Sequence, residues 1–491
     1  MPINRRDLLK ITVGAAATAS AGDMVAGCDT SPSAPLPEGK ADYTLRIGSG
    51  LVELAPDAIF STTTYNGQFP GPLLRFAEDR PAVVDVHNDT DVPEQVHWHG
   101  QQVPADVDGS AEEGTPFVPA HGMRRVSFTP GPAGFRFYHS HLIAGSDLAK
   151  GQYGGLVGPV YIEPKLNPGA YDQGVFLVLK EFAPTFSRAG DMAADFLAGA
   201  PDPELKERGE KAMADSLGRG MPRGYEVGYG AFSVNGRKLG QGEPIKVRAG
   251  QRMLLHVLNG SATEIRSLAL PGHVFRVVAL DGNPVPAPAR VPVLWIGTAE
   301  RVSAVVEMNR PGVWVLGDLA DSDRGAGMGI AVEYAGRTGP PQWTAPGPFT
   351  WDYRTFARAG AAAAAPDQTI DLLVEKRNAA VGGFNAWTLN GQSYSTALNQ
   401  PVIPVQRGKR YRLRLRNATD DVHPVHLHRH TVEVAAVAGT PTAGLFKDVV
   451  MLGGYQKLDL DFVADQPGLS LLHCHQQLHM DYGFMTLFNC T

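Results

Sequence analysis

The sequence contains little cysteine and no marked excess of either charge. Only three of its 491 residues are cysteines, Cys28, Cys474 and Cys490, so at most one disulfide bridge could form and a disulfide-rich scaffold is not expected. A formal net charge of −6 argues against a nucleic-acid-binding protein, which would carry a basic surface. Beyond the N-terminal region, no apolar run is long enough to cross a bilayer. These absences indicate a globular body that has no membrane span and no nucleic-acid partner.

The N-terminal residues resemble a targeting signal. The stretch "MPINRRDLLKITVGAAATASAGDMVAGCDT" contains the pair Arg5 and Arg6 and then a weakly apolar Ala/Gly/Thr run. This pattern, over residues 1–28, is typical of a twin-arginine export signal, which suits a protein exported in its folded state. The tetrapeptide "VAGC" resembles a lipobox that would make Cys28 a lipid anchor, and ordinary cleavage near the same place is the alternative. We therefore expect an exported protein, periplasmic or at the cell surface.

Glycine and proline are abundant and separate many short runs rich in Val, Thr and Leu. The chain holds 56 glycines and 38 prolines, a texture that favours an all-β protein built from sandwiches and barrels. Its length corresponds to roughly three domains of about 150 residues each.

A pattern recurs three times along the chain. Each copy has an Asn-Gly turn, a strand, a second turn, and an alternating strand that ends at an asparagine; the copies span residues 65–90, 234–261 and 389–419. Each unit also ends in a Pro-Gly turn followed by a β-rich strand. Repeats of domain size predict three β-sandwich domains of one ancestry, at about 40–165, 170–336 and 366–491. Between them, residues 185–224 look like a charged helical surface insertion, and residues 337–367 like a long linker.

Fifteen histidines are present, and most of them cluster in the first and third repeats. Four His-x-His pairs stand in the motifs "HWHG", "HSH", "HPVHLH" and "HCHQQLH": His97/His99, His139/His141, His426/His428 and His473/His475. In a strand, residues i and i+2 share one face and stand roughly 6.6 Å apart, which suits two neighbouring metal ions better than one chelated ion. The pairs therefore predict a multinuclear metal cluster between the first and third domains. We expect the remaining histidines to be ordinary surface or strand residues: His87, His121, His256, His273 and His430.

The residue between the last two paired histidines, Cys474, must face away from that cluster. There it can meet His423 and His479, and one thiolate with two imidazoles is the ligand set of a blue-copper site. A single His-x-His pair is a weak signal, and zinc also accepts Cys and His. Closed zinc sites use four ligands in compact clusters, however, so four pairs in two repeats favour copper.

These motifs resemble those of three-domain multicopper oxidases of the bacterial laccase type, in family order and over nearly all of the chain after residue 28. The stretches "GQYGGLVGPVYIEP" and "FKDVVML" match the surroundings of the motifs. The resemblance implies three cupredoxin-like Greek-key β-sandwiches, the third carrying the type 1 copper. It also implies four copper ions, one-electron oxidation of a donor, and four-electron reduction of dioxygen to water.

The resemblance also assigns ligands. The type 1 copper would be held by His423, Cys474 and His479. The type 2 copper would be held by His97 and His426. The type 3 pair would be held by His99, His139, His141, His428, His473 and His475.

The chain departs from the family's pattern at two places. Where some members carry an axial methionine, this chain has Phe484, which cannot coordinate, and we expect a three-coordinate type 1 copper of fairly high potential. A one-residue shift that brings Met485 to the copper is the alternative. For proton supply, Asp108 matches a family acid, or else it caps a turn. The glutamate that several relatives place after the last type 1 histidine is Met480 here.

The donor is expected to be a phenol or aromatic amine, oxidised through an exposed edge of His479 or His423. The alternative is a metallo-oxidase that detoxifies cuprous or ferrous ions. Such enzymes often carry a methionine-rich insertion, whereas the 12 methionines here are scattered. A non-catalytic relative would have lost copper ligands, and a two-domain nitrite reductase would lack the third repeat. We expect a monomer.

Overall fold

The computed structural model describes residues 38–165, 171–188, 196–395 and 402–491. The expected export signal and the candidate lipid anchor Cys28 lie outside these residues. Within them, no helix has both the length and the apolar character needed to span a membrane. Strands dominate the described chain, and the prediction of an all-β fold is confirmed.

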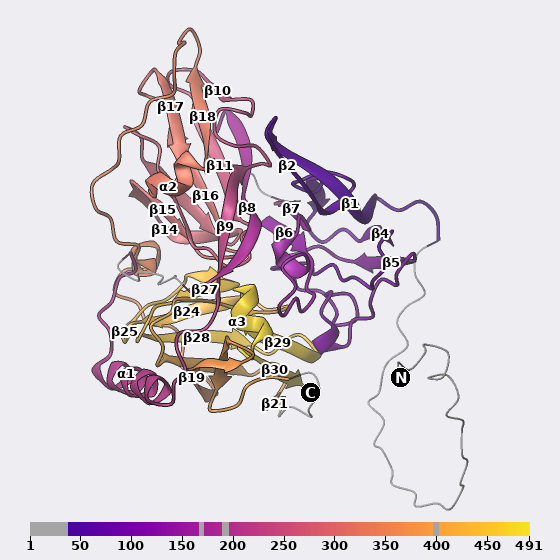
Figure 1. Cartoon of the computed structure of the whole chain (residues 1–491), viewed down its shortest axis with the longest axis vertical. Helices are drawn as coiled ribbons and strands as arrows, with labels where there is room; N and C mark the ends of the chain where they lie inside the picture. Colours follow the sequence, from indigo (N-terminus) through magenta and orange to yellow (C-terminus); the bar gives the residue numbers. More distant parts are fainter. Residues whose placement is uncertain (1–37, 166–170, 189–195, 396–401) are drawn as a thin grey trace, which may run out of the picture. The chain divides into compact units, whose positions relative to one another are not determined.

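The first sandwich pairs a sheet of order β2-β1-β4-β5 with a smaller sheet of order β3-β7-β6 (indigo to purple in Figure 1). Its strands are β1 Tyr43–Ala55, β2 Ala58–Tyr65, β3 Leu74–Ala77, β4 Ala82–Asn88, β5 Met123–Phe128, β6 Gly134–His139 and β7 Val157–Glu163. Two short 3-10 helices, η1 Ala111–Glu113 and η2 Gly151–Tyr153, lie in its loops.

The second sandwich has a large sheet of order β14-β13-β16-β11-β8-β9, with smaller sheets β10-β18-β17 and β12-β15. Its strands are β8 Gln173–Ser187, β9 Glu226–Val234, β10 Ile245–Val247, β11 Arg252–Asn259, β12 Arg266–Leu268, β13 Phe275–Leu280, β14 Asn283–Val291, β15 Leu294–Ile296, β16 Arg301–Glu307, β17 Val313–Gly317 and β18 Gly329–Tyr334. Two helices belong to this region, α1 Pro203–Gly218 and α2 Asp321–Gly325.

The third sandwich, yellow and orange in Figure 1, packs a sheet of order β20-β19-β22-β28-β24-β25 against one of order β21-β30-β29-β23-β27, and β26 pairs with β24. Its strands are β19 Gln368–Val381, β20 Phe384–Leu389, β21 Val402–Val405, β22 Arg410–Asn417, β23 His423–Leu427, β24 Val432–Val437, β25 Thr440–Pro441, β26 Phe446–Lys447, β27 Val449–Leu452, β28 Lys457–Val463, β29 Gly468–Cys474 and β30 Met485–Cys490. Short helix α3 Gln477–Asp481 follows β29.

The three Asn-Gly turns adopt one geometry. Asn66, Asn235 and Asn390 have φ values of 55, 51 and 52°, in the left-handed region that asparagine tolerates and a hairpin turn requires. Each asparagine side chain accepts from one backbone N–H and donates to one backbone carbonyl of the neighbouring strand, at Arg46/Thr44, Val178/Phe176 and Leu373/Asp371 respectively. Three identical turns at equivalent places support the common ancestry of the units.

The asparagines that end the alternating strands also share one role. Asn88, Asn259 and Asn417 are each at most 1% exposed. Each donates to two backbone carbonyls, and its Oδ1 accepts a backbone N–H two residues further on. A buried amide whose hydrogen bonds are satisfied locks the loop after the strand. In the first and third units that loop leads towards the histidine motifs.

The alternation of buried and less buried residues along a strand shows which face of its sheet belongs to the core. In β22 every second residue is buried, including Tyr411, Leu413 and Leu415, while the arginines between them face out to pair with Asp459, Asp461 and others. This period-two pattern is that of a sheet with one buried face.

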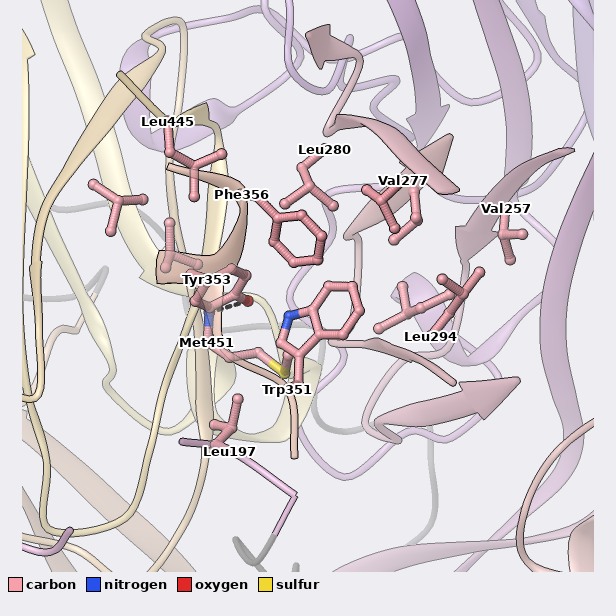
Figure 2. Packing of buried hydrophobic residues seen from close by; sticks show 14 of the residues in the cluster. Leu197, Val257, Val277, Leu280, Leu294, Trp351, Tyr353, Phe356, Leu445 and Met451 are labelled. Carbon is pink, nitrogen blue, oxygen red and sulfur yellow. Dashed lines mark hydrogen bonds between the residues drawn. The ribbon is translucent and has the colours of Figure 1, made fainter. Parts of the chain in front are cut away.

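The segment expected to be a linker, 337–367, packs into the body of the protein instead of running free. Trp351, Tyr353 and Phe356, the last two in the 3-10 helix η3 Tyr353–Phe356, are at most 2% exposed and pack with residues of the second and third sandwiches (Figure 2). The backbone N–H of Met451 donates to the Tyr353 hydroxyl at 3.2 Å. The helical insertion was expected correctly: α1 begins with Asp202 as its N-cap, leaves most of its residues exposed, and packs on β19.

Candidate metal centres

Cys474, His423 and His479 converge in the third sandwich. Cys474 ends β29, His423 begins β23, and His479 lies on α3. The Cys474 sulfur lies 3.6 Å from His423 Nδ1 and 3.5 Å from His479 Nδ1, and the two nitrogens are 3.0 Å apart. All three side chains are at most 1% exposed. Three ligand atoms this close, one sulfur and two imidazole nitrogens, form a trigonal set suited to copper.

Neither histidine of this set has the exposed edge that we expected for contact with a donor. His423 is 0% and His479 1% exposed, so that expectation is wrong. The Trp387 ring packs 4.0 Å from that of His479. On His423, Nε2 donates to the Thr419 hydroxyl at 2.9 Å, because that hydroxyl already donates to Asn417.

Phe484 lies beside the ligand set formed by His423, Cys474 and His479, whereas Met485 does not. The Phe484 ring lies 4.9 Å from that of His423, and Phe484 belongs to the same buried cluster as Cys474. Met485 packs in a different cluster with Leu471 and Met480. Successive residues point to opposite sides where β30 begins. The geometry therefore favours a set without an axial sulfur.

Eight imidazoles gather between the first and third sandwiches. Each is at most 1% exposed, and they come from the four predicted His-x-His pairs. Ligand atoms within 4.8 Å of one another form the groups His97/His99/His426, His99/His139/His475 and His141/His428/His473. Backbone pairing positions them: His97 bridges His139, and His426 of β23 faces His473 of β29. Three of the pairs stand at strand ends, whereas His97 is an isolated bridge residue and His99 lies in a turn.

Hydrogen bonds fix which nitrogen of each ring faces the cluster. The Nδ1–H groups of His97, His139, His426 and His473 donate to backbone carbonyls at 2.7–2.9 Å. His428 uses Nδ1 to reach Asp108 Oδ2 at 2.9 Å, and its Nε2 then lies 3.0 Å from His473 Nε2. His99 is reversed, since its Nε2 donates to Asp448 Oδ1 at 3.1 Å. Tautomers set in this way leave the other nitrogen's lone pair for a metal.

The nitrogens left over are buried and unpaired. Within the described residues, the atoms without a hydrogen-bond partner include Nε2 of His97, His139 and His426, Nδ1 of His99, and both ring nitrogens of His141 and His475. Orphaned buried polar atoms are costly, and so many aimed at one place need an explanation. Metal ions provide it, and the donor set of imidazole nitrogens suits copper.

Burial lowers the pKa of several of these histidines and keeps them neutral. Burial lowers the pKa of His423 to about 4 and those of His141 and His426 to about 3. Burial also raises the pKa of the Cys474 thiol, which a bound metal would reverse by stabilising the thiolate. Neutral imidazoles are the form that binds metal.

Asp108 and a second carboxylate, Glu113, lie beside the cluster. Asp108 is 0% exposed, and its Oδ2 is 3.0 Å from His97 Nδ1 as well as 2.9 Å from His428 Nδ1. Glu113 Oε1 lies 3.5 Å from His428 Nδ1 and accepts the Leu471 N–H at 2.6 Å. Burial, with the charge of Asp108, raises the pKa of Glu113. The sequence analysis missed Glu113, whose only signal is the acidic pair in "SAEEGT" after Asp108.

Asp448 was missed as well, although it stands in the quoted stretch "FKDVVML". Its carboxylate accepts from Arg136 of the first sandwich at 3.0 Å and from both terminal nitrogens of Arg301 of the second at 2.6 Å. All three residues are at most 1% exposed. Asp448 thus joins the three sandwiches and orients His99 at the same time.

A cavity of about 530 Å³ reaches the cluster at His141. Glu112 and Tyr394 line it, and Phe117 and Ile143, which are 42% and 40% exposed, border it. Glu112 Oε2 lies 3.8 Å from His141 Nδ1. This cavity is a route by which a small molecule can reach the imidazoles.

The middle sandwich holds no comparable group of ligands among its described residues. The five histidines expected to be ordinary surface or strand residues are absent from every ligand group in the described chain. His256, His273 and His430 are nevertheless buried, at 5–7% exposure.

Comparison with known proteins identifies relatives over the whole described body. Three family models, each described as multicopper oxidase, match residues 52–167, 207–332 and 367–491. The multicopper oxidase MmcO of Mycobacterium tuberculosis is 31% identical over 95% of this chain and 90% of its own length.

Two solved structures show the same fold. The laccase of Botrytis aclada has a TM-score of 0.71 and 21% identity, covering 91% of this chain and 87% of its own. Fet3p, a multicopper oxidase that functions in iron import, has a TM-score of 0.70 and 18% identity, covering 91% of this chain and 90% of its own. The expected fold of three cupredoxin-like domains is thereby confirmed.

Proposed function

The chain belongs to the multicopper oxidase family, and on this premise we propose which residues hold its copper ions and which donor it oxidises. The enzyme is a copper-dependent oxidase with four copper ions, which couples oxidation of a donor to reduction of dioxygen. The observation that carries the proposal is the tripeptide His473-Cys474-His475, which places a thiol in one ligand set and two imidazoles in the other.

The proposed ligands follow the geometry of the two sets. His423, Cys474 and His479 hold the type 1 copper, and His97 and His426 hold type 2. The remaining six imidazoles hold the type 3 pair, as the groups His99/His139/His475 and His141/His428/His473. Bound copper supplies one-electron redox chemistry at the first set and multi-electron reduction of dioxygen at the second.

The protein's own residues do the positioning. Backbone carbonyls and the carboxylates of Asp108 and Asp448 hold the imidazoles in their tautomers. The backbone of residues 473–475 joins the two sets covalently. We propose that Asp108 also relays protons for dioxygen reduction, as its contacts with His97 and His428 support. Turnover of Asp108→Asn at the normal rate, with copper content unchanged, would refute that role.

For the donor we propose a phenol or aromatic amine. Because His423 and His479 are buried, such a donor rests on the residues that cover them and not on the imidazole edges. A donor that makes few specific contacts is selected mainly by its reduction potential. The enzyme would therefore accept a broad range of donors. The test is oxygen uptake by the copper-loaded protein with 2,6-dimethoxyphenol and with cuprous ion under matched conditions. Faster uptake with the phenol supports the proposal, and uptake with cuprous ion alone overturns it.

A second candidate is oxidation of cuprous or ferrous ions, and one observation favours it. Acidic residues stand near the type 1 set: Asp420 and Asp421 pair with Lys376 at 2.5 and 2.8 Å, and the Asp421 charge acts on His423 and His479. A site with several carboxylates attracts cations. If Asp420→Asn slowed cuprous oxidation and left phenol oxidation unchanged, this candidate would replace the first.

We further propose that the protein is exported and acts as a monomer. Arg5, Arg6 and the stretch "VAGC" support export and a lipid anchor at Cys28. Replacing both arginines by lysine is expected to leave the protein in the cytoplasm. Mass spectrometry of the mature chain tests whether Cys28 carries a lipid anchor, because a diacylglyceryl group on Cys28 adds to the mass and simple cleavage does not. Light scattering of the purified protein gives its molar mass in solution and so tests whether it is a monomer.

A further inference from the structure

A second cavity lies between the first and second sandwiches, with no residue of either ligand set in its lining. Its volume is about 360 Å³, within the range of about 300–1,000 Å³ typical of small-molecule sites. The first sandwich contributes Phe135 and Tyr161, and the second contributes strands β11, β13, β14 and β16. Ligand sites are common where two domains meet.

The cavity exists because one sheet face is only partly covered. In β11 the residues Met253, Leu255 and Val257 face the core of the second sandwich, so Leu254, His256 and Leu258 face the first. Leu258 packs against Phe135 and Phe137 of β6. Further along the strand, at His256 and Leu254, the two sandwiches separate and leave the cavity.

His256 is a polar group built into an aromatic wall of this cavity. Its ring stacks on Phe176 at 4.6 Å and packs near Tyr161 at 5.2 Å and Phe135 at 5.5 Å. Its Nδ1 is hydrogen-bonded to the Ser303 hydroxyl at 2.8 Å, and Ser303 also lines the cavity. Nε2 remains for a ligand. Burial lowers the pKa of His256 to about 4, so the ring is neutral and offers one hydrogen bond, not a charge.

Arg276 supplies a positive charge on the same face. It lies on β13 and lines the cavity, and it forms no ion pair with any described residue. The neighbouring Arg290, opposite it on β14, pairs with Glu307 at 3.4 Å and is absent from the lining. A β-bulge between Val277 and Ala279 bends this strand and turns Val278 into the wall. Bulges of this kind often adjust side chains at functional sites.

The sheet register gives the span between the two polar groups. His256 pairs with Ser303, which pairs with Ala279, and the next row on the same face is Leu254, Val305 and Arg276. Two residues along the strands and two strands across place the Cα atoms of His256 and Arg276 about 12 Å apart. Side chains of this length leave room between their ends for one ring with a short arm.

We propose that this cavity binds an elongated aromatic carboxylate, with its carboxylate on Arg276, its ring among Phe135, Tyr161 and Tyr171, and a hydroxyl at its far end on His256. A hydroxyl both donates and accepts, so it satisfies either tautomer of the imidazole. The guanidinium gives the carboxylate a bidentate partner. This site is independent of the donor proposed above, since nothing is oxidised in it.

The test uses probes that a phenol oxidase does not oxidise. Calorimetric titration of the copper-loaded protein with 4-(hydroxymethyl)cinnamate is expected to show one saturable site, with weaker binding of 4-methylcinnamate, which lacks the hydroxyl. Arg276→Gln is expected to weaken both carboxylates about tenfold, the loss of one charged bidentate contact, and to leave 4-(hydroxymethyl)cinnamyl alcohol unaffected. Arg290→Gln is the matched control. It should change the affinity for both carboxylates less than twofold, because Arg290 is exposed, pairs with Glu307 and does not line the cavity.

His256→Phe separates the hydroxyl contact from the shape of the cavity. In this variant the two cinnamates are expected to bind with equal affinity. Arg276 is partly exposed, so its variant keeps the test valid even if His256→Phe folds poorly. Absence of saturable binding at millimolar probe overturns the proposal. An equal loss in the Arg276 and Arg290 variants also overturns it, because the attraction would then be diffuse.

Discussion

Replacing Asp448 by asparagine removes a negative charge that forms ion pairs with both Arg136 and Arg301. The carboxylate accepts from these guanidiniums at 3.0, 2.6 and 2.6 Å, and the three residues are 0–1% exposed. Removing one partner of a buried ion pair costs about 3–5 kcal/mol, because the remaining charge stays desolvated. Asp281 still lies 3.7 Å from Arg301, and asparagine keeps one oxygen acceptor. We therefore expect a loss near the lower end, about 3 kcal/mol.

The assay is guanidinium denaturation of the copper-free protein, so that metal binding does not enter the comparison. A chain of three sandwiches need not unfold in one step, and the shift is read from the transition in which the domains separate. Asp459→Asn is the control, since Asp459 pairs with Arg416 at 2.8 Å but is 19% exposed. Such a pair contributes about 0–1 kcal/mol. If the two variants lose equal stability, the burial argument for the junction is refuted.

The remaining predictions concern the type 1 set and one buried lysine. Cys474→Ser should abolish the intense visible absorption of the copper–thiolate bond and lower the copper content from four ions to three, measured by absorption and metal analysis. Phe484→Met should lower the type 1 potential in a redox titration, because a thioether can then approach the copper, whereas Met485→Leu should leave it unchanged, since that side chain packs elsewhere. Burial lowers the pKa of Lys180 to about 8, below its unfolded value of about 10.4. The unfolded state therefore binds more protons between these values, and stability should rise from pH 8 to 10 by about 2 kcal/mol. Lys180→Met should remove that rise, and a slope that persists in the variant would assign it to another group.

Much of the site could be predicted from sequence because its signals are local. The His-x-His pairs and the alternation around Cys474 depend on neighbours two residues apart, and strand geometry separates their faces. The Asn-Gly turns at Asn66, Asn235 and Asn390 could also be predicted from sequence, because hairpin turns need left-handed φ values and asparagine and glycine adopt them most easily. The placement of Phe484 near His423 was implied by the family resemblance, and the structure has the two rings 4.9 Å apart.

Other features carried little local signal. Glu113 stands in an acidic pair and Asp448 in the stretch "FKDVVML", but neither pattern shows a role, which arises only when segments far apart in sequence meet. The linker was judged from its prolines and alanines, but burial of Trp351, Tyr353 and Phe356 depends on the surfaces of two sandwiches. The exposed edge expected for His423 and His479 was wrong as well. Trp387 packs on His479, and Thr419 hydrogen-bonds to His423.

The sequence by itself determined the fold class, the three repeats and the candidate metal ligands, because each depends on residue types and short spacings. Only the tertiary structure decided how deeply the histidines are buried and which nitrogen each one presents. It alone showed how Arg136, Arg301 and Asp448 join three sandwiches, and where two sandwiches part to leave a cavity at His256. Burial and long-range ion pairs depend on packing between residues separated by more than a hundred positions, and no short stretch of sequence encodes that.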